Sequence, residues 1–316
     1  MQALDRSSFS QRAPQLARTS LDRAPATNWR HHFAQVEGVR LHWAELGEST
    51  SKPPLVLLHG LNDCYRSWRE LAPRLAVDRR VLIPDLPGHG LSGRPDASYE
   101  LQWYARILAR WLKTARVGRA DVVGHSFGGG VAQMILLHRP MRIRRLALVA
   151  SGGLGREVAM SLRLASVPHV VERLGQMFMG PCTRLAMGLT GNVFSANEAA
   201  RLAAMNAQKG TARAFARTVR DVIDWRGQKR TFFECAHELT TLPPLAVFWG
   251  DRDAVIPFAH AEALVKAVDG VRFTRFDGCG HYPHRERPDL FIGALRDFLD
   301  SPVAAPAAWA ARHADS

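Results

Sequence analysis

Short apolar runs alternate with stretches of helical periodicity along most of this 316-residue chain. Strands that alternate with helices need crossover connections, which make a sheet mostly parallel and give an α/β domain. The pattern predicts strands at 55–59, 81–85, 121–124, 146–150, 245–249 and 272–276, and helices at 67–76, 101–115, 127–137, 259–268 and 290–299. A two-stranded hairpin is expected before them, with strands 33–36 and 39–45 flanking Glu37-Gly38.

The alternation is interrupted once. Residues 153–240 contain several helical stretches and no expected strand, which predicts an all-helical insert, here called the cap. The α/β core is expected to comprise residues 29–152 and 241–300. Residues 1–28 are rich in Ser, Arg, Ala and Pro without periodicity and are expected to form a disordered arm, and residues 301–316 a flexible tail.

Composition narrows the function classes. The net charge is +13, but the basic residues are spread along the chain without a run of five, so no specific nucleic-acid partner is expected. The apolar runs are too short to cross a bilayer, and the N-terminal segment lacks the apolar core of a secretory signal, so a cytoplasmic location is expected. The four cysteines lie far apart, which argues against a zinc site or a disulfide framework.

The segment Gly124-His125-Ser126-Phe127-Gly128 matches the pattern G-x-S-x-G. A strand is expected directly before it and a helix directly after it, which is the context that the pattern requires. Small residues on either side of the serine let the chain turn sharply and present the hydroxyl at a helix N-terminus. Ser126 is therefore the candidate nucleophile, and an incidental serine in a glycine-rich turn is the disfavoured alternative.

A serine hydroxyl needs a base to take its proton. Reactive groups of a parallel sheet gather at the carboxyl ends of the strands. His281 lies in a glycine-containing loop between the last expected strand and the last helix, so we assign it as the base. His284 is the main competitor, whereas His125 is expected to point away from Ser126 and His59 belongs to a different motif.

An acid is required to hold the imidazole of the base in the correct tautomer. Asp251 and Asp253 both follow the strand expected at 245–249. We assign Asp253, because Asp251 fits a turn residue that satisfies the local backbone.

Negative charge that develops on a substrate oxygen needs preorganised hydrogen-bond donors. The backbone N–H of Phe127, next after the nucleophile, is the first expected donor. The second is expected from the loop that follows residues 55–59, and by topology we assign it to Leu61.

Five segments resemble the α/β-hydrolase superfamily over about residues 32–300. They are His59-Gly60 with Trp68 downstream, Asp85-Leu86-Pro87-Gly88-His89-Gly90-Leu91-Ser92, Gly124-His125-Ser126-Phe127-Gly128-Gly129, Trp249-Gly250-Asp251-Arg252-Asp253 with Pro257, and Gly280-His281 with Pro283 and Glu286.

The resemblance implies an α/β-hydrolase fold with an eight-stranded, mostly parallel sheet and a helical cap over the site. It also implies the triad Ser126, Asp253 and His281, which has the chain order of this superfamily, and oxyanion donors at Leu61 and Phe127. Members that act on haloalkanes or epoxides carry aspartate at the elbow, so the serine here disfavours both activities.

These residues predict hydrolysis of a carboxylic ester of a small molecule through an acyl-enzyme, with no metal and no cofactor. Two alternatives stay open. The same triad serves C–C bond hydrolases and cofactor-free perhydrolases, and a hydrolase scaffold also serves as a non-enzymatic binding protein, although the intact triad disfavours this last alternative.

The cap is expected to decide the substrate. Its large apolar residues either line an adaptable acyl pocket or pack the cap onto the core, and packing is favoured for most of them. A pocket of this kind predicts an apolar or lipid-like ester as substrate. The residues concerned are Met160, Met177, Phe178, Met179, Met187, Phe194 and Met205.

Overall fold

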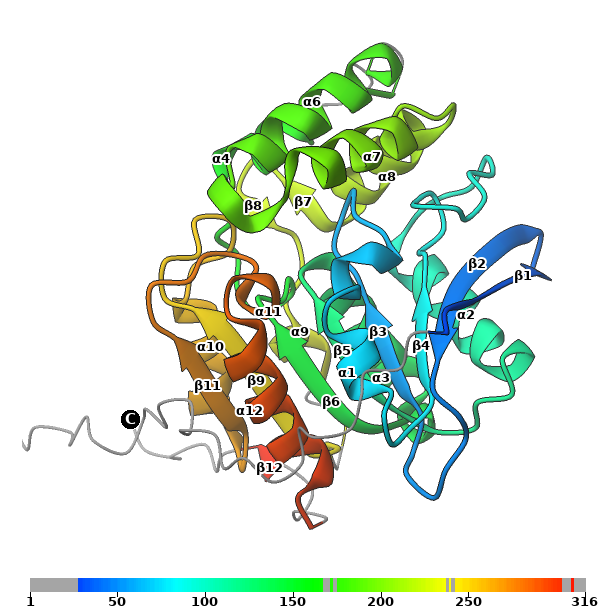
Figure 1. Cartoon of the computed structure of the whole chain (residues 1–316). Coiled ribbons are helices and arrows are strands. Elements are labelled where there is room, and N and C mark those ends of the chain that lie inside the picture. The colour runs from blue at the N-terminus through cyan, green and yellow to red at the C-terminus, as the bar shows by residue number, and fades with distance from the viewer. Residues whose placement is uncertain are drawn as a thin grey trace, which may run out of the picture.

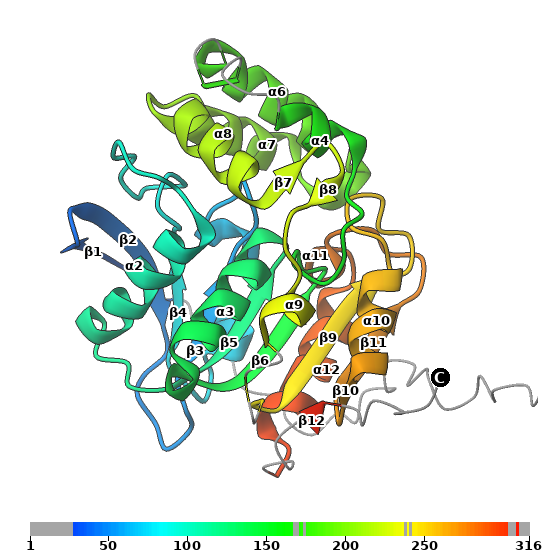
Figure 2. The ribbon, with the colours of Figure 1, turned by 180° about the vertical axis from the view of Figure 1, so that it is seen from behind.

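The computed structural model describes residues 28–166, 171–172, 175–236, 239, 242–302 and 308–309. The arm expected at 1–28 therefore lies almost wholly outside the described residues, as does most of the tail. An eight-stranded sheet forms the centre of the molecule, with helices on both faces and the cap above one end (Figures 1 and 2).

The sheet is mixed and mostly parallel, as predicted. β1 pairs antiparallel with β2 and β2 pairs antiparallel with β4, while the other strands run parallel to one another. The spatial order is β1 (Arg30–Val36), β2 (Val39–Leu46), β4 (Val81–Pro84), β3 (Leu55–Leu58), β5 (Ala120–His125), β6 (Ile143–Val149), β9 (Leu245–Gly250) and β11 (Arg272–Phe276).

All of the predicted strands form, and the largest shifts, of three residues each, are at the starts of β1 and β6. The pattern placed the start of β6 at residue 146, but β6 begins at Ile143 and includes Arg144 and Arg145. Arg144 binds the buried carboxylate of Asp121, with an Nε–Oδ1 distance of 2.7 Å. A partner far away in the chain thus allows a charged residue to lie inside this strand. A search for apolar runs misses that part of the strand.

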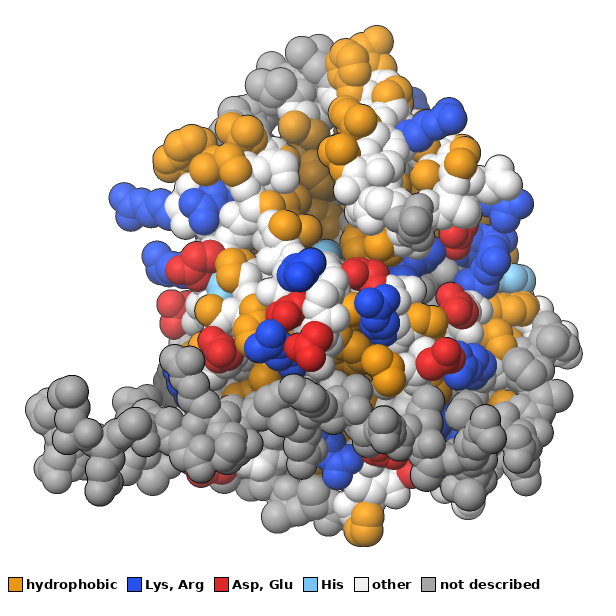
Figure 3. All heavy atoms as spheres, turned by 60° about the vertical axis from the view of Figure 1, so that its left-hand side comes forward, with side chains coloured by type: hydrophobic (Ala, Val, Ile, Leu, Met, Phe, Trp, Pro, Cys, Tyr) orange, Lys and Arg blue, Asp and Glu red, His pale blue; other side chains and the backbone are white. Residues whose placement is uncertain are grey.

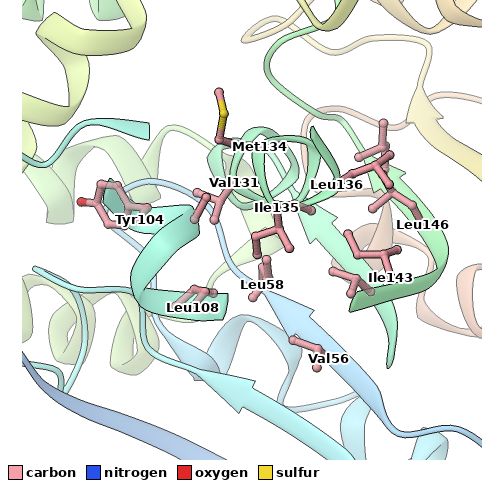
Figure 4. Packing of buried hydrophobic residues seen from close by; sticks show 14 of the residues in the cluster. Val56, Leu58, Tyr104, Leu108, Val131, Met134, Ile135, Leu136, Ile143 and Leu146 are labelled. Atoms are coloured by element: carbon pink, nitrogen blue, oxygen red, sulfur yellow. The ribbon is translucent and has the colours of Figure 1, made fainter. Parts of the chain in front are cut away.

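Helices cover the two faces of the sheet. α1 (Ala72–Leu75) and α12 (Pro288–Asp300) pack on one face, and α2 (Leu101–Thr114), α3 (Phe127–His138) and α10 (Ala259–Ala267) pack on the other. β3 is buried on both faces, because Leu55 and Leu57 contact the first group and Val56 and Leu58 contact the second. Figure 4 shows Leu58 beside Ile135 of α3 in this second layer.

One predicted helix is divided in two. Residues 67–76 were expected to form a single helix, but the chain forms a 3₁₀ turn, η2 (Tyr65–Trp68), and then the short α1. Pro73 explains the division, because proline has no N–H to donate within a helix and is accommodated only in its first turn.

The cap joins β6 to β9. It consists of α4 (Met160–Ala165), α6 (Gln176–Gly188), η4 (Gly191–Val193), α7 (Ala196–Asn206), α8 (Thr211–Val222) and α9 (Phe232–Ala236). The predicted helical insert is therefore confirmed, with one addition: β7 (Ile223–Asp224) and β8 (Gly227–Gln228) form a short antiparallel pair. No helix among the described residues is long and apolar enough to span a bilayer.

Two further local features complete the fold. Ala308 and Trp309, in the segment expected to be a flexible tail, form β12, which pairs with β10 (Val268–Asp269).

On the face of the core shown in Figure 3, Lys and Arg side chains are interspersed with Asp and Glu, in keeping with basic residues that are spread along the chain.

Asp85, at the end of β4, ties three separate segments together. Its carboxylate is fully buried and accepts hydrogen bonds from His42 Nδ1 at 2.7 Å, Tyr65 N at 2.6 Å and Leu91 N at 2.8 Å. Burial alone raises the pKa of the Asp85 carboxyl, but the hydrogen bonds, chiefly that from His42, outweigh it and leave the pKa below its ordinary value. Gly90 is required beside it, because a Cβ there would lie 2.2 Å from Asp85 Cγ.

We therefore expect Asp85→Asn to lower the free energy of unfolding at pH 7 by about 2–4 kcal/mol, because buried donors lose a charged acceptor. Since the native pKa is depressed, the contribution of the carboxylate is fully present above its unfolded-state pKa. It is lost as the pH falls through the native pKa, so wild type and variant should converge in acid. Urea unfolding across pH measures this difference. The exposed Asp277, paired with Arg275, gives the control Asp277→Asn, expected within about 0.5 kcal/mol of wild type; equal losses in the two variants would contradict the prediction.

Candidate active site

Ser126 occupies a strained turn between the end of β5 and the start of α3. Its φ is +53° and its ψ is −119°, a conformation that a non-glycine residue adopts only when the surroundings impose it. The surroundings here are hydrogen bonds: Ser126 N donates to Val149 O at 2.9 Å, and Ser126 O accepts from Gly129 N at 3.0 Å and Gly152 N at 3.1 Å. The turn presents the side chain of Ser126 to the cavity above the sheet.

Close packing explains the two glycines of the G-x-S-x-G pattern. A Cβ at Gly124 would lie 2.6 Å from the carbonyl oxygen of Gly128, and one at Gly128 would lie 2.5 Å from that of His59. Both contacts are with backbone, which has no freedom to move aside. Side chains at these positions would therefore push α3 away from β5 and β3 and open the turn.

His281 and Asp253 meet at the carboxyl ends of β11 and β9. The distance from His281 Nδ1 to Asp253 Oδ2 is 2.8 Å, and both side chains are buried. The other carboxylate oxygen, Oδ1, accepts hydrogen bonds from the N–H groups of Val255 at 2.8 Å and Ile256 at 2.9 Å. Because a carboxylate only accepts, Nδ1 of His281 carries the proton and Nε2 is left free of it. Ser126 and His281 line the same cavity.

The loop that carries His281 is fixed by the side chain of Glu286. Glu286 Oε2 accepts from Gly280 N at 2.8 Å and Oε1 accepts from Tyr282 N at 3.1 Å, so one carboxylate holds the residues on either side of His281. His125 adds a third restraint, since its Nε2 lies 2.9 Å from the carbonyl oxygen of His281. Burial, and next the neighbouring His281, lower the pKa of His125 well below its ordinary value, so it is neutral and donates through Nε2–H.

The competing candidates lie elsewhere. His284 is fully buried behind the site against Trp68, with its Nε2 3.3 Å from Ser67 Oγ. His59 is also buried, and its Nε2 accepts from Leu86 N at 3.0 Å. Asp251 accepts from Gly278 N at 2.7 Å and from Arg275 at 2.8 Å, the turn role expected of it.

Leu61 and Phe127 both border the cavity beside Ser126. Phe127 is the first residue of α3, so its N–H is one of those that have no acceptor within the helix. Gly60 lies close to the turn at Ser126, because a Cβ built on it would be 3.2 Å from Ser126 Cβ. The next residue along the chain is Leu61.

A cap residue holds the loop that contains Leu61. Asn206, at the end of α7, is fully buried, and its Nδ2 donates to the carbonyl oxygen of Asn62 at 2.8 Å and contacts Thr183 Oγ1 at 3.2 Å. Asn62 itself has a positive φ of +57°. Sequence reasoning did not find Asn206, because nothing in its local pattern signals a contact with a loop far earlier in the chain.

The cavity has a volume of about 940 Å³ and lies between the cap and the carboxyl ends of the strands. Its walls are mostly apolar, with contributions from Met134, Leu162, Met187 and Phe215. Of the seven apolar cap residues proposed to line or pack, Met187 alone borders this cavity, while Phe194, Met205 and the buried Met179 pack inside the cap or onto the core.

The expectation for Met160, Met177 and Phe178 was wrong on both counts. Each is more than half exposed, and none borders the cavity. Helical periodicity shows which residues share a face, but α6 carries apolar residues on two faces, and only tertiary packing decides which face turns inward.

Other reactive groups are poorly placed for chemistry. Burial raises the pKa of Cys279 to about 11, so its thiol is not a nucleophile near neutral pH. Among the described residues, no three His, Cys, Asp or Glu side chains are grouped as a metal site would require.

The chain belongs to the α/β-hydrolase fold family, whose model matches residues 53–288. It is 32% identical over 279 residues to an uncharacterised protein of Mycobacterium tuberculosis, a match that covers 85% of this chain and 81% of the relative. It is 27% identical over 260 residues to the 2-hydroxy-6-oxo-2,4-heptadienoate hydrolase of Pseudomonas putida, covering 78% and 88%.

Solved structures agree with this family. Cfl2 from Burkholderia cenocepacia superposes with a TM-score of 0.73 at 25% identity, over 86% of this chain and 96% of the other. The protein is thus an α/β hydrolase.

We expect Glu286→Ala to slow the reaction of Ser126 with a fluorophosphonate about 10- to 100-fold, because the His281 loop loses the acceptor for two N–H groups. Glu286→Gln keeps an acceptor oxygen and should fall between the alanine variant and wild type. The labelling rate, followed by mass spectrometry, measures this effect. Glu262→Ala, on the exposed surface of α10, is the matched control; labelling of Glu286→Ala at the wild-type rate would refute a positioning role for Glu286.

Proposed function

We propose that this protein hydrolyses carboxylic esters with apolar acyl groups through an acyl-enzyme on Ser126. Ser126 is the nucleophile, His281 the general base and Asp253 the acid that orients it. The observation that carries this proposal is the 2.8 Å hydrogen bond from His281 Nδ1 to Asp253, which leaves Nε2 to take a proton at the cavity that Ser126 also lines.

The first half-reaction follows from this arrangement. His281 Nε2 removes the hydroxyl proton as Ser126 Oγ forms a bond to the carbonyl carbon, and the oxyanion is stabilised by the N–H groups of Leu61 and Phe127. The carbon–oxygen bond to the alcohol then breaks, and the alcohol leaves with the proton from His281. Water repeats the sequence on the acyl-enzyme and releases the acid, so no further reactant is needed.

The cavity supports an apolar acyl group. A volume of about 940 Å³ with mostly apolar walls favours a hydrocarbon chain over a small polar acid. Each buried methylene contributes at most about 0.8 kcal/mol, so kcat/KM on p-nitrophenyl esters should rise several-fold over the first few carbons added to an acetyl group.

We expect Ser126→Ala to lower kcat on p-nitrophenyl octanoate by at least about 10³-fold while the chain stays folded, because no acyl-enzyme can form. Turnover measures the loss of kcat. The intact-protein mass after fluorophosphonate treatment shows whether the variant can still form a covalent adduct. Ser98→Ala, an exposed serine that does not line the cavity, serves as the control. Turnover of the Ser126 variant at the wild-type rate would exclude the mechanism.

A second candidate is cleavage of a carbon–carbon bond by the same triad. The similarity to a dienoate hydrolase of Pseudomonas putida favours it, and so do Arg230 and Arg252 at the cavity wall, which offer counter-charge to an anionic substrate. Loss of absorbance of a 2-hydroxy-6-oxo-dienoate, compared with ester turnover by the same sample, separates the two reactions. On this alternative Arg252→Gln should raise KM for the dienoate and leave that for a neutral ester unchanged.

We also expect Asn206→Ala to reduce kcat about tenfold with KM little changed, because the loop of Leu61 loses the donor that holds the Asn62 carbonyl. Such a split distinguishes a loosened oxyanion site from a weakened substrate pocket. Asn197→Ala, exposed on the same helix, is the control. Ester kinetics measure both variants, and a rise in KM alone for Asn206→Ala would show that the contact serves binding instead.

A further inference from the structure

The outward side of α6 is apolar, although it faces solvent. Met177, Phe178, Leu185 and Leu189 are between 55% and 79% exposed, and Pro181 between them is exposed as well. We call these five residues the outer face of α6. In Figure 3 hydrophobic side chains gather at the upper end of the molecule, over the cap, while acidic side chains lie lower.

The opposite side of α6 already supplies the contacts that hold the helix in the cap. Met179, Gly180 and Thr183 are buried there, and α6 packs against α7. The outer face is therefore not needed to attach α6 to the protein. A helix that is apolar all round is ordinarily buried, so an exposed one indicates a surface that something else covers.

The charge around this face indicates what kind of partner it binds. From Val158 to Asn197 the sequence contains a single acidic residue, Glu172. Its carboxylate is bound by Arg217, with an Nε–Oε1 distance of 2.8 Å, and by Arg220. The same stretch contains three arginines, of which Arg184 lies on α6 itself, and the whole chain has a net charge of +13.

The outer face also reaches the active-site cavity. Leu189, which directly follows α6 and is the most exposed of the five residues, borders that cavity, and so do Ala186 and Met187 of α6. An apolar surface thus continues from the outside of the cap into the space above Ser126.

We propose that the outer face of α6 binds the surface of a membrane that contains anionic lipids, with its apolar side chains at the headgroup boundary and Arg184 toward the headgroups. An apolar helix face that carries an arginine, on a helix that has no carboxylate of its own, is the pattern of interfacial helices. Docking in this way places the side of the cavity that Leu189 borders at the lipid surface. This proposal concerns binding and does not depend on which bond the triad cleaves.

A second copy of the chain fits this face less well. Two copies joined through α6 would bring the positive charges of Arg184 from both chains into one interface, and the carboxylate of Glu172 is already engaged by two arginines. Lipid phosphates instead supply the negative charge with which an arginine side chain pairs.

The test is sedimentation of the full chain with vesicles of phosphatidylcholine alone or with one-third phosphatidylglycerol. We expect binding to the anionic vesicles that weakens as salt is raised. The double variant Phe178→Ser/Leu185→Ser should bind about tenfold more weakly or worse, and Arg184→Gln about fivefold more weakly. Met141→Ser is the matched control, since Met141 is 76% exposed but lies in η3 (Pro140–Arg142), which precedes β6 and so lies away from the cap.

A second measurement covers the case in which the double variant misfolds. Cys182 lies on the exposed side of α6, whereas Cys64 and Cys279 are buried. An environment-sensitive fluorophore on Cys182, in a chain carrying Cys235→Ser, should shift to the blue with anionic vesicles and be quenched by lipids labelled near the headgroup.

Three results would overturn the proposal: no sedimentation of the wild type with anionic vesicles, equal binding by wild type and a folded double variant, or no change in the Cys182 fluorophore. Analytical ultracentrifugation that finds a dimer of the wild type and a monomer of the double variant, without vesicle binding, would assign the face to self-association instead. None of these readings requires turnover, so failure of the proposed esterase activity leaves them distinguishable.

Discussion

The close approach of β5, α3 and β3 around Ser126 is the constraint on which the site depends. A positive φ at a residue with a side chain costs of the order of 1–3 kcal/mol and persists only where packing over-determines it. Here the backbone hydrogen bonds of Ser126 to Val149, Gly129 and Gly152 supply that support. Gly124 and Gly128 let the three backbones come within contact distance. The strain thus sits where backbone hydrogen bonds hold the chain on both sides of the turn, and it fixes the direction of one side chain.

The cap is joined to the core by polar contacts as well as by apolar packing. Asn206 reaches the carbonyl of Asn62, Arg285 pairs with Glu198 at 2.9 Å, and Arg94 Nε donates to Thr211 Oγ1 at 2.7 Å. Hydrogen bonds of this kind are directional, so they fix how the cap lies on the core more closely than apolar contact alone. Because one of them ends on the loop of Leu61, the position of the cap and the geometry beside Ser126 are linked.

The sequence was sufficient for the parts of the fold that local patterns determine. Buried parallel strands are continuous apolar runs, and the turn at Ser126 has a composition that few other structures require. The sequence was insufficient where residues far apart in the chain determine the local structure. β6 can begin before Arg144 because Asp121 binds that arginine, and Asn206 holds a loop that lies far away in the chain. The β7–β8 pair is too short for any periodicity to reveal it. The pairing of His281 with Asp253 was found because strand ends converge, which is a rule of topology and not of local sequence.

α6 shows why the substrate question is harder than the fold. Met179 and Met187 face inward while Met177 and Phe178 face outward, yet a prediction based only on which residues are apolar cannot tell the four apart. In the core, burial on both faces of the sheet makes apolar identity sufficient, so a pattern predicts position. In the cap, apolar residues serve three different purposes: packing, lining the cavity and forming an exposed surface. In our proposal charge separates the third purpose from the other two, because the lack of a carboxylate on α6 matters only where its outer face meets an anionic partner.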